Sequence, residues 1–403
     1  MNQAFCILGR QPALGIAELE SLFGGDNIQP IGEHGALLNI EPAQIDFTRL
    51  GGTVKFCKLL TILDTVNWRH VEKFLAETTP QHLDYMPEGK MRLGLSVYGF
   101  SMRPQQIAAT GLTLKKVIRA SGRSVRVIPN VETALSSAQV LHNQLTGPLG
   151  WELIFVKHGS KTLIAQSIAV QDIESYTLRD RGRPKRDAKV GMLPPKLAQI
   201  IINLAVGLIE PVDPACSPKT THDSTILDPF CGTGVILQEA LIMGYRAYGT
   251  DIDRRMFEYS QTNLEWLMDK LQPTQKEFRV SIGDATQNEW VKPIDTVACE
   301  TYLGRPFSAQ PTADVLSGVI HDVNTIIKKF LKNLARQLSP GTRLCIAVPA
   351  WNTEKNFKHL PVLELIEELG YTRTSFVHVS NADLVYHRPD QVVARELIVL
   401  IRK

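Results

Sequence analysis

One stretch of the sequence decides the fold of the C-terminal half: Asp228-Pro229-Phe230-Cys231-Gly232-Thr233-Gly234. A short apolar run at residues 225–227 precedes it, and an apolar segment with helical spacing follows at residues 235–243. Glycine lets the backbone approach a ligand closely, and the first turn of a helix presents unpaired N–H groups. A strand, a glycine turn and a helix in this order therefore predict a loop that binds a nucleotide-like ligand.

Two details around this loop separate the possible ligands. A dinucleotide-binding loop has a third glycine three positions after the second, and here that position is Leu237. Asp228 stands four residues before Gly232, where a carboxylate repels a pyrophosphate but holds a cationic amino-acid group through ordered water. Both details favour S-adenosylmethionine over NAD as the cofactor.

The next two strands end in further acids. Asp251 lies in Gly249-Thr250-Asp251-Ile252-Asp253, where it is placed to accept ribose hydroxyls. Asp284 lies in Gly283-Asp284-Ala285, where it is placed to accept the adenine amino group. The predicted cofactor-binding residues are therefore Asp228, Phe230, Gly232, Gly234, Asp251 and Asp284.

Strand and helix signals alternate from residue 193 to the C-terminus. Seven strands are predicted, at residues 225–227, 246–249, 278–282, 296–299, 343–348, 374–379 and 396–401. Helices are predicted at residues 196–208, 235–243, 254–271, 313–338 and 353–369. This alternation is typical of an α/β fold with a mostly parallel sheet that binds its ligand at the carboxyl ends of the strands. We therefore predict a Rossmann-like, class I methyltransferase domain over residues 193–403.

The N-terminal half has a different pattern. Residues 1–60 predict a small α/β domain, and residues 61–176 predict a second, α+β domain with a basic amphipathic helix at residues 104–120. Residues 177–192 are polar and basic and contain glycine and proline, which predicts a linker.

Positive charge is concentrated in this half although the net charge is only +3. Residues 90–131 contain no Asp or Glu, and a second basic stretch covers residues 179–186. Such stretches are either solvated faces or binding sites for a polyanion, and both interpretations stay open on charge alone. The candidate RNA-binding residues are Arg103, Lys115, Lys116, Arg119, Arg181, Arg183, Lys185 and Arg186.

Composition excludes several other classes of protein. Hydrophobic residues make up 44% of the chain and charged residues 21%, which gives no case for disorder. Apolar runs stay well short of the roughly 20 residues that span a bilayer, so no membrane partner is expected. The six cysteines form no CxxC pair and the ten histidines form no HxH or HExxH cluster. We therefore expect no metal site, no disulfide framework and a reducing, cytoplasmic location.

Two segments together carry a family resemblance. Leu227-Asp228-Pro229-Phe230-Cys231-Gly232-Thr233-Gly234, preceded by Gly191-Met192-Leu193-Pro194-Pro195-Lys196-Leu197-Ala198, resembles the THUMP-containing tRNA N2-guanosine methyltransferases that modify guanosine at position ten. The resemblance covers nearly the whole chain, but only strand and helix order matches in the THUMP-like region. It implies that residues 61–176 grip the tRNA acceptor end; it says nothing of an accessory subunit.

The end of the fourth strand departs from this family. Methylating an exocyclic amine requires acceptors for its N–H bonds and a flat surface for the extruded base. The family supplies these with Asp/Asn-Pro-Pro-Tyr/Phe, whereas this chain has Glu300-Thr301-Tyr302-Leu303. We expect Glu300 to accept an amine hydrogen and Tyr302 to flank the base.

Three functions remain open from the sequence. The first is an S-adenosylmethionine-dependent enzyme that methylates N2 of a guanosine in tRNA. The second is an RNA-binding paralogue with weak or no transfer, because the two prolines that fix the backbone in the family are missing here. The third is a DNA amino-methyltransferase, which the long basic N-terminal half disfavours.

Overall fold

The computed structural model describes residues 3–187, 192–209, 223–307, 309–353, 356–389 and 391–403. Contacts divide the chain into two compact units. Unit 1 comprises Met1–Pro12, Asp26–Thr48 and Thr53–Glu174, and unit 2 comprises Ala13–Gly25, Arg49–Gly52 and Ser175–Lys403.

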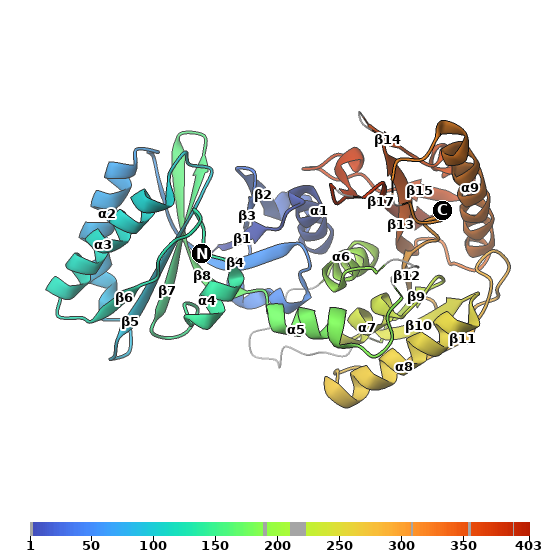
Figure 1. The fold of residues 1–403 in the computed structure, drawn as a ribbon, viewed down its shortest axis with the longest axis horizontal. Coiled ribbons are helices and arrows are strands. Elements are labelled where there is room, and N and C mark those ends of the chain that lie inside the picture. The colour runs from blue at the N-terminus through green and yellow to red at the C-terminus, as the bar shows by residue number, and fades with distance from the viewer. Residues whose placement is uncertain (1–2, 188–191, 210–222, 308, 354–355, 390) are drawn as a thin grey trace. The chain divides into compact units, whose positions relative to one another are not determined.

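Unit 1 contains one eight-stranded sheet in the order β2-β3-β1-β4-β8-β7-β5-β6. Its strands are β1 (Ala4–Leu8), β2 (Ile28–Ile31), β3 (Gly35–Leu38), β4 (Thr53–Leu63), β5 (Met91–Tyr98), β6 (Val125–Val127), β7 (Gly150–His158) and β8 (Lys161–Val170). Strand β5 runs parallel to β6 and β7, and the other pairs are antiparallel. Helices α2 (Trp68–Leu83) and α3 (Pro104–Ala120) pack side by side on one face (Figure 1). The shorter elements are α4 (Ser137–His142) and 3₁₀ turns at Gly25–Asn27, Pro42–Gln44 and Phe47–Arg49.

The predicted boundary at residue 60 falls inside β4. Residues 53–58 of this strand pair with β1, and residues 55–63 pair with β8, so one strand joins both predicted N-terminal domains into one sheet. Residues 53–63 contain no glycine or proline that would interrupt the strand. The observed division therefore differs from the two domains expected before residue 177.

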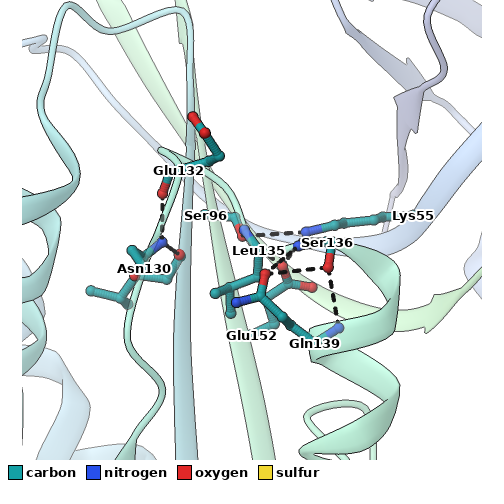
Figure 2. A network of polar contacts seen from close by, with 9 residues as sticks. Lys55, Ser96, Asn130, Glu132, Leu135, Ser136, Gln139 and Glu152 are labelled. Carbon is teal, nitrogen blue, oxygen red and sulfur yellow. Dashed lines mark hydrogen bonds and ion pairs between the residues drawn. The ribbon is translucent and has the colours of Figure 1, made fainter.

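A buried ion pair ties the centre of this sheet together. The Lys55 ammonium on β4 contacts the Glu152 carboxylate on β7, and both side chains are almost fully buried. The Ser96 hydroxyl on β5 donates to Glu152 at 2.6 Å and accepts from the Leu135 N–H at 2.9 Å (Figure 2). Because a buried charge is costly without its partner, this network ties three strands and the segment leading to α4 to one another.

Unit 2 contains a sheet in the order β11-β10-β9-β12-β13-β17-β15, with β14 paired to β13 and β16 paired to β17. The strands are β9 (Thr225–Asp228), β10 (Arg246–Asp251), β11 (Phe278–Ile282), β12 (Thr296–Glu300), β13 (Arg343–Asn352), β14 (Phe357–Lys358), β15 (Tyr371–Arg373), β16 (Val385–Tyr386) and β17 (Val393–Arg402). Strands β9 to β13 in this path are parallel, and β17 runs antiparallel to β13.

Helices cover both faces of this sheet. Helices α6 (Pro195–Val206), α7 (Val235–Ile242) and α8 (Arg254–Lys270) share one core, and α9 (Ala313–Ala335) shares the other with a 3₁₀ turn at Pro361–Leu365. The remaining elements are α5 (Ile173–Thr177), a π-helical turn at Leu178–Gly182 and a 3₁₀ turn at Asn381–Asp383. The predicted doubly wound, Rossmann-like fold is confirmed.

Two predicted elements near the C-terminus are wrong. The helix expected at residues 353–369 is replaced by β14 and the 3₁₀ turn, because Pro361 cannot continue a helix from the residues before it. The strand expected at residues 374–379 is an irregular segment that follows β15.

Helix α1 (Pro12–Phe23) is built into unit 2 although it lies near the N-terminus. Leu14 and Ala17 belong to the same core as α6 and α7. The buried Glu18 carboxylate accepts from the Gly51 and Gly52 N–H groups at 2.9 and 2.8 Å and from Asn203 Nδ2 at 2.8 Å. The methyltransferase-type core therefore needs residues that precede it by some 200 positions.

We predict that Leu14→Ala lowers the free energy of unfolding by about 3 kcal/mol, because Leu14 is 1% exposed and the change leaves a cavity. Urea unfolding followed by circular dichroism measures the loss. The control is Leu112→Ala on α3, where the side chain is 55% exposed. Equal losses for the two variants would contradict the assignment of α1 to this core.

Candidate functional site

The glycine turn lies between β9 and α7. Gly232 has φ +51° and Gly234 has φ +82°, a left-handed conformation that favours glycine. A Cβ on Gly234 would lie 2.5 Å from the Ser260 hydroxyl of α8. The Gly234 N–H donates to the Cys231 carbonyl at 2.7 Å, which closes the turn. The residue type at position 234 is therefore dictated by both conformation and space.

The two acids at the strand ends face this turn. Asp228 is 1% exposed and accepts from the Phe230 N–H at 3.1 Å. Burial raises the pKa of Asp228 well above its usual range, and the nearby carboxylates of Asp251 and Glu300 raise it further. Asp251 accepts from the Gly232 N–H at 2.9 Å, and burial raises its pKa as well. This accumulation of acids suits a ligand that brings a positive charge.

Asp284 makes hydrogen bonds within its own turn, which leave its expected contact with adenine a prediction. Its carboxylate accepts from the Thr286 N–H at 2.9 Å and from the Thr286 hydroxyl at 2.8 Å. These bonds fold the turn after β11, yet a carboxylate oxygen has lone pairs left for a further donor.

Phe230 packs edge-on against Phe330 of α9, with ring centroids 4.9 Å apart.

These elements enclose a cavity of about 780 Å³ at the carboxyl ends of the strands. Five of the six predicted cofactor-binding residues line it, and Gly234 lies just behind them in the turn. Glu300 and Tyr302 line the same cavity. The structure thus brings together, in one cavity, residues that are some 70 positions apart in the sequence.

Sequence reasoning missed other residues of this cavity. The lining also includes Leu193, Arg305, Ile326 and Lys329, the last two from the middle of α9. Pattern analysis recognises α9 only as an amphipathic helix, so no local signal distinguishes Lys329 from a solvated lysine. Its place at the site depends on how α9 packs on the sheet.

The end of β12 is held by its neighbours. The Thr301 N–H and hydroxyl both donate to the Ala347 carbonyl of β13, at 2.9 and 3.1 Å. The Glu300 carboxylate pairs with Arg395 of β17. The Tyr302 side chain, 45% exposed, lies at the cavity wall, where a base could stack on it.

The predicted RNA-binding residues fall into two groups, each described within its own unit. In unit 1, Arg103, Lys116 and Arg119 are exposed at and along α3, and Lys115 is half-buried. In unit 2, Arg181, Lys185 and Arg186 are exposed. These residues stay candidates for phosphate contacts.

Arg183 corrects the prediction for the second group. It is 2% exposed, so its guanidinium is not placed to reach a phosphate. The stretch is packed rather than linker-like: Arg179 pairs with the buried Glu239 at 2.7 Å, and Asn263 of α8 holds the backbone of Lys185. Residues 188–191 of the predicted linker lie outside the described residues.

Within the part of the chain that the structure describes, no group of three His, Cys, Asp or Glu side chains could hold a metal ion. Five cysteines are buried there and form no disulfide with one another; the sixth, Cys216, lies outside the described residues. No described helix is long and apolar enough to cross a membrane.

Comparison with known proteins agrees with the geometry. Residues 190–300 match the family model described as RMKL-like, methyltransferase domain. These residues therefore form a methyltransferase domain, the class of domain for which the sequence analysis expects S-adenosylmethionine as cofactor. The residues present fit S-adenosylmethionine: a glycine turn where a Cβ would collide, the buried Asp228 beside the half-buried Asp251, and a cavity of about 780 Å³.

Two curated relatives are both named tRNA (guanine(10)-N2)-dimethyltransferase. The tRNA (guanine(10)-N2)-dimethyltransferase of Methanothermobacter thermautotrophicus is 31% identical over 159 residues, 40% of this chain and 39% of that protein. The enzyme of that name from Pyrococcus abyssi is 27% identical over 264 residues, 64% of this chain and 68% of that protein. The chain thus spans about two fifths of the first relative and two thirds of the second. These matches support the resemblance to tRNA guanosine-N2 methyltransferases; its THUMP-like part stays a prediction.

A solved structure supports the fold over the whole chain. The crystal structure of TrmN from Thermus thermophilus superposes with a TM-score of 0.52 at 15% identity, covering all of both chains. At this identity the likeness concerns the fold alone.

We predict that Gly234→Ala weakens S-adenosylmethionine binding at least 10-fold, because the new Cβ collides with Ser260 and strains the turn. Isothermal titration calorimetry measures the affinity. The matched control is Gly341→Ala, which has the same backbone strain at φ +85° but open space around the Cβ. An unchanged affinity in Gly234→Ala would contradict the role of the turn.

Proposed function

We propose that this chain is an S-adenosylmethionine-dependent tRNA methyltransferase that methylates the exocyclic N2 of a guanosine. One observation carries the proposal: the glycine turn between β9 and α7, hereafter the cofactor turn, lines a single cavity together with Glu300 and Tyr302. The names of the curated relatives support the same reaction and substrate.

The bound cofactor supplies a methyl group on a positively charged sulfonium. The chain must present the amine nitrogen to it with the lone pair turned towards the methyl carbon. Glu300 accepts an amine N–H bond, which draws that hydrogen away and orients the lone pair. As the N–C bond forms, the S–C bond breaks, and the proton lost from nitrogen passes to Glu300 or to solvent.

The residue type at position 300 favours guanine over adenine. The Watson–Crick edge of guanine presents two adjacent donors, N1–H and the N2 amino group, whereas adenine presents one donor beside an acceptor. A carboxylate oxygen is an acceptor only, so it can accept from either guanine donor and repels the adenine ring nitrogen. This chemistry argues against adenine as the target base, and thus against the third candidate, a DNA amino-methyltransferase, as an adenine-methylating enzyme.

The proposed substrate grip lies in unit 1. We assign to its α3 surface, with Arg103, Lys115, Lys116 and Arg119, the contacts to tRNA phosphates, in the role that the THUMP-like region has in the resemblance. Arg181, Lys185 and Arg186 of unit 2 are proposed as further contacts. A tRNA-modifying enzyme with free cysteines fits the cytoplasm, which we propose as its location.

The direct test is to incubate the purified protein with bulk tRNA and methyl-labelled S-adenosylmethionine, and to digest the product to nucleosides. We expect label in N2-methylguanosine, or in N2,N2-dimethylguanosine. Label in another nucleoside would refute the assigned base. Cofactor binding without label in any nucleoside would favour the RNA-binding paralogue.

We predict that Glu300→Gln lowers kcat about 100-fold with little change in cofactor affinity, because an amide nitrogen then faces the amine donors. Single-turnover transfer and calorimetry measure the two quantities. The exposed Glu368→Gln on the same unit serves as the control. Undiminished turnover in Glu300→Gln would contradict the role of this carboxylate.

We predict that Lys116→Ala and Arg119→Ala each weaken tRNA binding and reduce its salt slope by about 1. Filter binding at several salt concentrations measures the slope. Lys73→Ala on α2 is a matched control, since this exposed lysine has the carboxylate of Glu77 at 3.8 Å. An unaltered slope in both α3 variants would place the tRNA surface elsewhere.

A further inference from the structure

The candidate catalytic carboxylate has a charged partner that the motif does not contain. Arg395 Nε donates to Glu300 Oε1, and the side chains are 8% and 15% exposed. Arg395 belongs to β17, which is separated from β12 by the whole width of β13. The pair therefore reaches across an intervening strand.

The register of the sheet explains how the two side chains meet. Glu300 is the partner of Ala347 on β13, and Ala347 is the partner of Leu397 on β17. Arg395 lies two residues from Leu397 and thus on the same face of the sheet as Glu300. Ala347 is fully buried and has only a methyl group, which leaves the space that the long arginine side chain crosses.

The contact between Arg395 and Glu300 lies next to the two positions at which the family has prolines and this chain does not. Two prolines fix the backbone after the family's acid, but here those positions are Thr301 and Tyr302. Glutamate also has one more rotatable bond than aspartate. Thr301 restores the backbone by its two hydrogen bonds to Ala347, and Arg395 restores the side chain by holding one carboxylate oxygen.

Other acids lie near Glu300, so Arg395 also offsets negative charge at this end of the sheet. Asp228 on β9 faces Glu300, and Asp251 on β10 adds its charge to the same cluster. Tyr302, Arg305 and Lys329 line the cavity in front of it. Arg395 does not line the cavity, so its contact with Glu300 leaves the cavity free for the ligand.

We propose that Arg395 is the positioning residue of the methyl-transfer site: by holding one oxygen of Glu300, it aims the other oxygen at the guanine amine. This inference rests on the proposed function. It assigns to the C-terminal strand a role that neither the cofactor turn nor the Glu300-Thr301-Tyr302-Leu303 segment reveals. Because Oε1 of Glu300 accepts from Arg395, Oε2 is the oxygen left for the guanine amine.

The test compares Arg395→Gln with wild type on tRNA. We expect kcat to fall about 100-fold while the KM for tRNA and the affinity for S-adenosylmethionine change less than threefold. We also expect the acid side of the pH–rate profile to move to higher pH, because a carboxylate without its cation among other acids binds a proton more readily. Arg395→Lys, which keeps the charge but loses the planar fork, should recover part of kcat and most of the pH profile.

The matched control is Arg373→Gln. Arg373 on β15 pairs with Glu396 at 3.2 Å, and Glu396 follows Arg395 on β17 but points to the opposite face. This change removes an arginine–glutamate pair from the same strand without touching the cavity. We expect its kcat and pH profile to match wild type.

Thermal unfolding of Glu300→Gln, Arg395→Gln and the double variant decides whether the pair exists in solution, independently of activity. Losses of Tm that are clearly less than additive support it, and additive losses overturn it. Unchanged kcat and pH profile in a folded Arg395→Gln overturn the positioning role. A wild-type protein that binds cofactor but methylates no guanosine overturns the proposed function instead. The additivity of the Tm losses still shows whether Glu300 and Arg395 interact.

Discussion

The carboxyl end of β9 imposes the constraint on which the site depends. Strands β10 and β12 pair with its two edges, so the chain reverses its winding direction here and leaves a crevice above the sheet. The backbone must turn sharply to enter α7 beneath that crevice, with positive φ at Gly232 and Gly234 and with Ser260 pressed against the second glycine. The acids of β9 and β10, the cofactor cavity and the end of β12 all derive their positions from this turn.

Acid chemistry follows from the same packing. Asp228 is buried at the strand end beside Asp251 and Glu300, an arrangement that costs free energy unless positive charge is brought close. In the proposed function, the sulfonium and the ammonium group of S-adenosylmethionine would supply such charge from the ligand side, while Arg395 supplies it from the protein side. In this view the divergent Glu300-Thr301-Tyr302-Leu303 segment is compensated by neighbouring strands, with Thr301 anchored to β13 and Glu300 to β17.

The methyltransferase-type unit is also discontinuous in the chain. Helix α1 and residues 49–52 complete its core, with the buried Glu18 holding two backbone N–H groups and the Asn203 amide. Unit 1 has its own internal ties, including the Lys55–Glu152 pair, and carries the basic α3 surface. Cofactor binding and the proposed tRNA grip are thus encoded in interleaved segments, which accounts for the difference from a linear series of domains.

Local sequence signals were sufficient to predict some of the helices, strands and turns. The basic helix at residues 104–120, the strand at residues 278–282 and the glycine turn were all predictable, because periodicity and backbone conformation depend on near neighbours. Other features were not predicted from such signals. Pro361 interrupts the helix expected at residues 353–369, and Arg183 is buried. Arg395 contacts Glu300, Lys329 lines the cavity, and α1 packs into the core of unit 2. The sequence by itself determined the cofactor turn and the fold class. Only the tertiary structure decided which distant charges meet at Glu300, because strand order and register place residues about 100 positions apart within bonding distance.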